Sequence, residues 1–245
     1  MISGCLQHCE RWTLASATRR FDLGRDLLKI IAIATMVVDH VGNILYPDLL
    51  FLQMIGRLSF PIFAYLIVLG VDSTKKPFNY MVSLFVFAVA SQVPYFLAFR
   101  IQPLERLNIL FSLLLSAVTI YYYNKRSPVA FVPLLLSMIF PTEGSYYVVV
   151  TAVGMKLLKD NAKLGALLLL ALNLQFVLLP MDIHSQIQVL ALCAVPIIFL
   201  HIKNKLTKEI VIPENSLVYL VRKYFFYFFY PLHLAILFFL NMPVL

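Results

Sequence analysis

The sequence has few charged residues. They make up 13% of its 245 residues, hydrophobic residues make up 61%, and the mean hydropathy is +0.86. Soluble domains contain about 25% charged residues, which keep their surfaces in contact with water. Long apolar runs recur along the whole chain and leave no stretch for a sizeable soluble domain. The composition therefore predicts an integral membrane protein.

Cysteine is also scarce. The three cysteines, Cys5, Cys9 and Cys193, are odd in number and have no framework spacing, which excludes a disulfide scaffold. The sequence also lacks a glycine-rich phosphate loop, an H-E-x-x-H motif, a G-x-S-x-G motif and a paired C-x-x-C motif. Its histidines and aspartates do not have the spacing of metal ligands, so no metal is predicted.

Acidic residues are outnumbered by basic ones, 12 against 20, which gives a net charge of +8. The basic residues lie in short loops on alternate sides of the apolar runs. A groove that follows nucleic-acid phosphates needs a contiguous basic face, whereas basic clusters in loops on alternate sides of apolar runs are the topology signal of membrane proteins. We therefore expect no nucleic-acid partner.

Apolar runs of about 20 residues predict an all-α, polytopic transmembrane helix bundle of about nine spans, within a range of eight to ten. The predicted spans are residues 27–46, 50–71, 78–99, 107–123, 129–140, 145–158, 162–180, 183–202 and 217–240. With a cytoplasmic N-terminus, nine spans leave only Arg100 and Arg106 outside and Arg57 within a span. Residues 1–26 are then a polar cytoplasmic segment, and residues 27–245 form a single membrane domain.

The first two predicted spans carry residues that a lipid-exposed helix disfavours. Asp39 and His40 lie in the first span, and Arg57 lies in the second, close to Pro61. A charge at the bilayer centre costs roughly 2.5–3.5 kcal/mol on insertion scales. Arg57 is the expected counter-ion of Asp39, because its planar guanidinium matches a carboxylate. The pair either serves a functional site or only fixes two helices against each other.

Other polar residues are predicted at a similar depth in the outer half of the bilayer. Asn43 lies one helical turn beyond Asp39, and Tyr230 and His233 lie deep enough in the last span to need partners. Prolines in three of these spans predict kinks near this depth. We therefore expect a cavity in the bundle, to which several spans contribute polar side chains. Gln92, Asn108 and Gln186 lie at the same depth as His233, and Ser59 is a further candidate.

Several segments resemble the TraX family of conjugal-transfer proteins, of the F-pilin acetylase type, in order and spacing. These are LLKIIAIATMVVDHVGNILYP, IGRLSFPIFAYLIVLG, the Gln92-Val93-Pro94 tripeptide, LNILFSLLL, the Glu143-Gly144 turn and RKYFFYFFYPLHLAIL. The resemblance covers residues 27–240. The chain departs from the family pattern in its longer polar N-terminus, in Ser116 in place of a glycine and in Glu143 in place of an aspartate.

The resemblance implies a membrane-bound, acetyl-CoA-dependent acyltransferase in a prokaryotic inner membrane, with residues 27–245 as the acyltransferase-like domain. The acceptor would be an amine or hydroxyl of a pilin or peptide N-terminus or of an envelope glycan. His40 would act as general base or transient acyl carrier, with Asp39 and Arg57 beside it. The expected substrate-binding residues are Asn43, Ser59, Gln92, Asn108, Glu143, Tyr230 and His233.

Two other functions are compatible with the same residues. Intramembrane Asp39, His40 and Arg57 could instead form the relay of a proton-coupled transporter. The chain could also be a non-catalytic assembly subunit in which the Asp39–Arg57 pair is purely structural. The sequence leaves open the acceptor, the choice between N- and O-acylation, and the oligomeric state.

Overall fold

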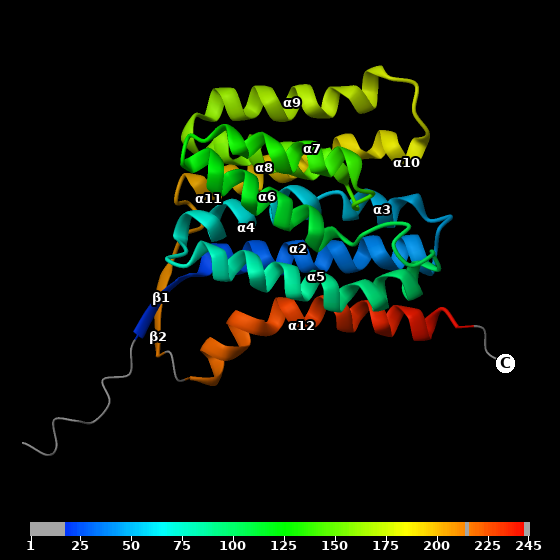
Figure 1. Ribbon diagram of the computed structural model, residues 1–245, viewed down its shortest axis with the longest axis horizontal. Coiled ribbons are helices and arrows are strands. Elements are labelled where there is room, and N and C mark those ends of the chain that lie inside the picture. Colours follow the sequence, from blue (N-terminus) through cyan, green and yellow to red (C-terminus); the bar gives the residue numbers. More distant parts are fainter. Residues whose placement is uncertain (1–17, 214–215, 243–245) are drawn as a thin grey trace, which may run out of the picture.

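The computed structural model describes residues 18–213 and 216–242, and most of them are helical. Helices of the described residues lie side by side in one bundle, from α9 at one edge to α12 at the other (Figure 1). The elements are β1 (Thr18–Asp22), α2 (Leu23–Ile44), α3 (Leu50–Gly56), α4 (Ser59–Ser73), α5 (Pro77–Phe99), α6 (Ile109–Asn124), η2 (Pro128–Ala130), α7 (Phe131–Ile139), α8 (Ser145–Asp160), α9 (Ala162–Leu178), α10 (Ile183–Gln186), η3 (Ile187–Cys193), α11 (Ala194–Ile202), β2 (Glu209–Pro213) and α12 (Leu217–Leu240).

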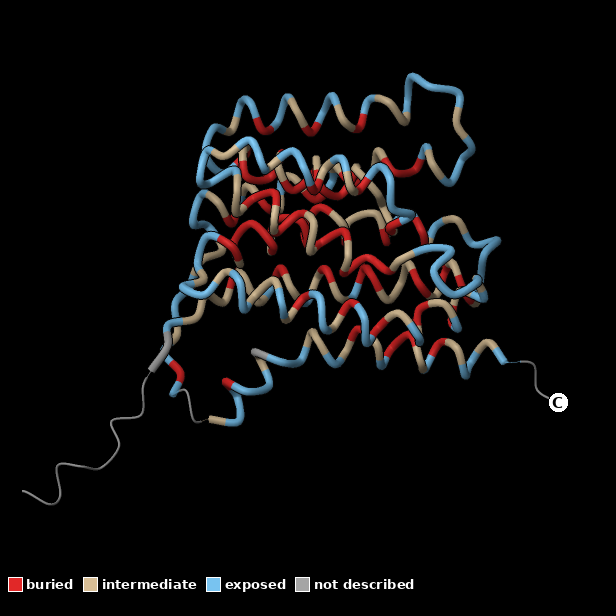
Figure 2. The backbone as a smooth tube through the Cα atoms, in the orientation of Figure 1, coloured by how far each residue is buried: buried red, intermediate tan, exposed pale blue. Residues whose placement is uncertain are grey.

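The core lies along the middle of the bundle, and helix α4 runs through it. Ile62, Ala64 and Val68 of this helix are completely buried. Figure 2 shows that buried residues are concentrated in the central helices, while residues of α9 and α12 at the two edges are mostly exposed or half-buried. Their outward side chains are largely Leu, Val and Phe, which suits contact with lipid.

The helices follow the predicted segments closely. Four helices of the described residues are long and apolar enough to cross a membrane: Leu23–Ile44, Leu50–Ser73, Pro77–Phe99 and Ile183–Ile202. The other apolar helices are shorter. The prediction of a mostly helical membrane protein is therefore confirmed.

A two-stranded sheet was not predicted. β1 pairs antiparallel with β2, so that Thr18 lies opposite Pro213 and Asp22 opposite Glu209. Asp22 also caps helix α2, because its Oδ1 accepts a hydrogen bond of 2.9 Å from the Gly24 amide. Helix α2 therefore begins at Leu23, before the predicted start at residue 27. Residues 1–17 of the predicted N-terminal segment lie outside the described residues.

The second predicted span is interrupted at Arg57, as the position of Pro61 indicated. Helix α3 ends at Gly56, Arg57 is its C-cap, and α4 begins at Ser59. The Ser59 hydroxyl donates to the Gly56 carbonyl at 2.8 Å and satisfies one acceptor at the break. Pro94 and Pro231 instead lie inside continuous helices, α5 and α12.

Replacing Gly165 by alanine is expected to lower the free energy of unfolding by about 1–3 kcal/mol. A Cβ at this position of α9 would lie 2.1 Å from the backbone nitrogen of Leu158 on α8, which cannot move aside. Gly154→Ala is the matched control, because the three atoms nearest to its Cβ all belong to the side chains of Leu169 and Leu168 and none to the backbone. Thermal unfolding of both variants in detergent measures the difference, and equal melting temperatures would contradict this packing.

Candidate functional site

Two histidines meet in the core although they lie 193 residues apart in the sequence. Nδ1 of His40 on α2 is 2.8 Å from Nε2 of His233 on α12, and the two rings are parallel to within 2°. The residues are only 3% and 6% exposed. Nδ1 of His233 is in turn 3.0 Å from the carbonyl oxygen of Phe229, one turn earlier on α12.

This chain of contacts defines which nitrogen carries each hydrogen. A carbonyl oxygen only accepts, so Nδ1 of His233 is the donor to Phe229. In a neutral imidazole the second nitrogen is an acceptor, so Nδ1 of His40 donates to Nε2 of His233. Nε2 of His40 is therefore the unprotonated nitrogen, with a lone pair available to a reactant.

Aromatic rings enclose the histidine pair. Phe99 meets His40 edge-on at a centroid distance of 5.5 Å, and Phe229 stacks on His233 at 5.2 Å. Tyr230, completely buried, is tilted against both histidines. These contacts restrict the rotation of the two imidazoles and keep water away from the bond between them.

Asp39, adjacent to His40 on α2, faces Arg57 at the break between α3 and α4. Arg57 Nη2 lies 4.0 Å from Asp39 Oδ1, so the predicted pairing is present. The carboxylate accepts a 3.0 Å hydrogen bond from Asn43, and Arg57 donates to Gln188 at 3.1 Å. Gly56 permits this approach, since a Cβ there would lie 2.2 Å from the Asp39 side chain.

These charged residues line a cavity of about 470 Å³ at the end of the bundle where α3 and α10 lie, opposite the β1–β2 sheet (Figure 1). A smaller cavity of about 20 Å³ lies beside His40. The two cavities share Asp39, Phe60 and Glu143 in their walls. His40 therefore borders a space of about the size of one water, and three residues of its wall separate it from a cavity that is large enough for part of a substrate.

The walls of the larger cavity hold polar atoms that protein groups do not satisfy. Among the described residues, Asp39 Oδ1, Arg57 Nε, Glu143 Oε2 and Gln188 Nε2 are buried and have no hydrogen-bond partner. Buried polar groups are normally paired, and such exceptions mark strain or a site for a ligand or water. Two of these atoms are donors and two are acceptors, which suits a polar ligand of mixed character.

The structure brings most of the predicted site residues together. Asn43 and Glu143 line the larger cavity, and Ser59 lines the small one. Tyr230 and His233 do not line either cavity, because they pack on the inner side of His40.

Gln92 and Asn108 lie elsewhere. The Gln92 amide oxygen accepts from both the backbone and the side chain of Asn108, at 3.0 and 2.8 Å, and Asn108 caps helix α6. Both residues are thus used to join α5 to α6, and neither lines the cavity. A polar residue at the expected depth can be satisfied by a neighbouring helix end, and its depth alone does not show that it faces a cavity.

Three residues of the cavity were missed as candidates for binding. Gln188 contacts Arg57, His184 is 2.8 Å from Gln53, and Arg106 follows helix α5. The sequence did contain a signal for Arg106, because it is one of only two basic residues predicted on the outer side of the membrane. Gln188 lies in η3, where the chain leaves α-helical geometry, so a helical pattern could not have placed it.

A third cavity, of about 190 Å³, extends inwards from near the sheet end of the bundle. Its walls include the cationic side chains of Arg25, Lys29 and Arg222 and the apolar side chain of Phe63. Phe63 also lines the small cavity beside His40. A basic outer part and an apolar inner part are therefore arranged in sequence towards the histidine pair.

The sequence of the chain was compared with those of known proteins, and it matches one family. A family model described as TraX protein matches residues 24–241. The chain is 29% identical to the protein TraX of Escherichia coli K12 over 156 residues, 60% of this chain and 61% of that protein. It is 34% identical to an uncharacterized protein of Rickettsia prowazekii over 100 residues, 41% of this chain and 38% of that protein.

The matched regions thus span less than two thirds of either relative. No solved structure matches the chain. The family match covers both histidines, the Asp39–Arg57 pair and the whole bundle from α2 to the end of α12. The chain belongs to the TraX family.

Proposed function

We propose that this protein transfers an acetyl group from acetyl-CoA to an amine or hydroxyl of a membrane-associated acceptor. The observation that carries the proposal is the free Nε2 of His40, which the hydrogen bond to His233 leaves unprotonated beside a polar cavity. A positioned imidazole with a free lone pair is the commonest general base in proteins. The family supports an acetylase of the F-pilin type, with a pilin, a peptide or an envelope glycan as the acceptor.

The proposal includes a topology. The chain crosses a prokaryotic inner membrane about nine times, and its N-terminus and the sheet end of the bundle face the cytoplasm. The distribution of Lys and Arg supports this orientation, because cytoplasmic loops carry an excess of both. The cavity lined by Asp39 and Arg57 then faces the outer side, where a pilin or a glycan is available.

The donor approaches from the opposite end. Lys29 and Arg222 pair with Asp26, so with Arg25 three cations face one carboxylate, and this surplus of positive charge suits the phosphates of CoA. The apolar part of the cavity that ends at Phe63 suits the acyl-bearing arm. Because Phe63 also borders the small cavity beside His40, the thioester can reach the histidine from this side. Donor and acceptor therefore meet at His40 from opposite faces of the membrane.

The transfer follows from this arrangement. Nε2 of His40 takes a proton from the acceptor while the acceptor nitrogen or oxygen bonds to the thioester carbonyl carbon. The carbon–sulfur bond breaks, and the proton passes from His40 to the CoA sulfur. Arg57 stabilises negative charge that develops in the transition state, and Asp39 holds Arg57 in place. In a variant of this route, Nε2 carries the acetyl group transiently.

The test is release of free CoA by the purified chain in lipid nanodiscs, with a peptide bearing a free N-terminus as one acceptor and a sugar as the other. We expect CoA release that depends on an acceptor, and a product heavier by one acetyl group in the mass spectrum. A liposome experiment separates the alternative of proton-coupled transport. Proton-driven substrate flux without any acetyl consumption would overturn the acyltransferase proposal.

A further inference from the structure

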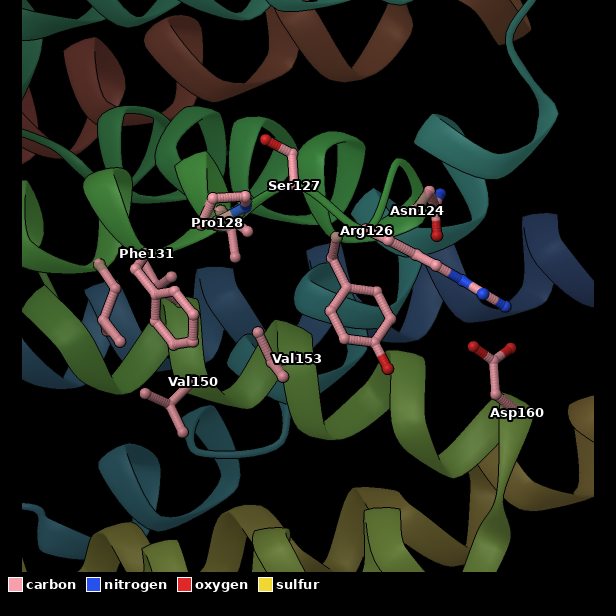
Figure 3. A pocket seen from close by; sticks show the side chains of 13 residues that line it. Asn124, Arg126, Ser127, Pro128, Phe131, Val150, Val153 and Asp160 are labelled. Carbon is pink, nitrogen blue, oxygen red and sulfur yellow. The ribbon is translucent and has the colours of Figure 1, made fainter.

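A cavity of about 820 Å³ lies between helices α6, α7 and α8 (Figure 3). It shares no lining residue with the cavities around His40. Helix α7 has nine residues, whereas α6 and α8 on either side of it have 16 each. Its walls also include Pro128 and Ala130 of η2, which leads directly into α7, so the cavity lies beside the start of this helix.

The two ends of this cavity differ in chemistry. Figure 3 shows the guanidinium of Arg126 and the carboxylate of Asp160 at one end, and Phe131 and Val150 at the other. Val153 lies between them on α8. The cavity therefore suits an amphipathic molecule with a charged group at one end and a hydrocarbon chain at the other.

The cavity reaches the lipid-facing surface. Phe131 lines it and is at the same time 68% exposed. Leu135 and Ile139 follow on the outer face of α7 and are 57% and 74% exposed. In a membrane protein such a face contacts lipid, so a molecule can enter this cavity sideways from the bilayer.

The charged side chains at the polar end of the cavity favour binding of a phosphate group. Within the part of the chain that the structure describes, the exposed side chain of Arg126 makes no ion pair or hydrogen bond. The neighbouring Lys125 lies over the ring of Tyr121, and Asp160 is paired with Lys156 at 3.4 Å. Arg126 is thus the cation that remains available, and a guanidinium binds phosphate oxygens in a bidentate manner.

We propose that this cavity binds a membrane phospholipid, with the phosphate on Arg126 and an acyl chain along Phe131, Val153 and Val150. A primary-amine headgroup fits best, because its ammonium can contact the half-exposed carboxylate of Asp160. Bound in this way, the lipid fills the cavity between α6, the start of α7 and α8. The proposal does not rest on acyl transfer, since the site is separate from His40.

The experiment is native mass spectrometry of the full chain in detergent, titrated with phosphatidylethanolamine. Arg126→Gln is expected to weaken binding about tenfold, which corresponds to one lost charge-assisted hydrogen bond. Val150→Trp fills the apolar end and should weaken binding to a similar degree. Lys125→Gln is the matched control and should leave binding unchanged, because Lys125 does not line the cavity.

Three results would overturn the proposal. The first is equal binding of diacylglycerol, which has no phosphate, and the second is unchanged binding to Arg126→Gln. The third is displacement of the lipid by acetyl-CoA in an Arg126-dependent manner, which would assign the cavity to the donor. His40→Ala should bind the lipid normally, so failure of the acyltransferase proposal would leave this one standing.

Discussion

Replacing His40 by alanine is expected to lower the rate of acetyl transfer by about 10²–10⁴-fold, the range that a positioned general base contributes. The variant removes Nε2, the one atom at the site whose lone pair the hydrogen bond to His233 leaves free. The measurement is CoA release in nanodiscs at saturating acetyl-CoA, together with the melting temperature of the variant. A full rate in folded His40→Ala protein would show that the base has been assigned wrongly.

Variants of His233 test how His40 is positioned. His233→Ala removes the acceptor for Nδ1 of His40, so the hydrogen can then occupy either nitrogen and fewer molecules have a free Nε2. We expect a smaller loss than for His40→Ala, in kcat rather than in KM. His233→Gln supplies an amide oxygen as a new acceptor and should recover part of the rate. A merely structural histidine would not show this recovery.

Asp39→Ala is expected to destabilise the protein by about 3 kcal/mol, the lower part of the range for breaking a buried ion pair. The variant leaves Arg57 without its counter-ion. The side chain of Arg57 is only 16% exposed and that of Asp39 only 13% exposed. Chemical unfolding in mild detergent measures the loss. Arg20→Gln breaks the exposed pair with Glu209 and is the control, with an expected change below about 1 kcal/mol.

The double variant Asp39→Asn/Arg57→Gln separates a structural role from a catalytic one. Two neutral amides replace two charges, so much of the lost stability should return. Acetyl transfer should remain low, because the guanidinium of Arg57 is no longer there to stabilise the transition state. Recovery of both stability and rate would show that the pair only fixes the helices against each other.

The sequence by itself determined the helices and the pairing of charges that are close along the chain. Apolar runs bounded by polar loops predict helix positions well, because each helix satisfies its own backbone hydrogen bonds. The break at Arg57 could be predicted because Pro61 removes a donor four residues later. The contact of Asp39 with Arg57 could be predicted because an insertion cost on two adjacent spans favours their pairing.

Only the tertiary structure decided the partner of His40. The contact with His233 depends on how α2 and α12 are rotated about their axes, and periodicity within one helix carries no information about that rotation. The same reason explains why Gln92 and Asn108 satisfy each other away from the cavity, while Gln188 turns towards Arg57. Local sequence determines which segments are helical, whereas side-chain packing between helices determines which polar groups meet.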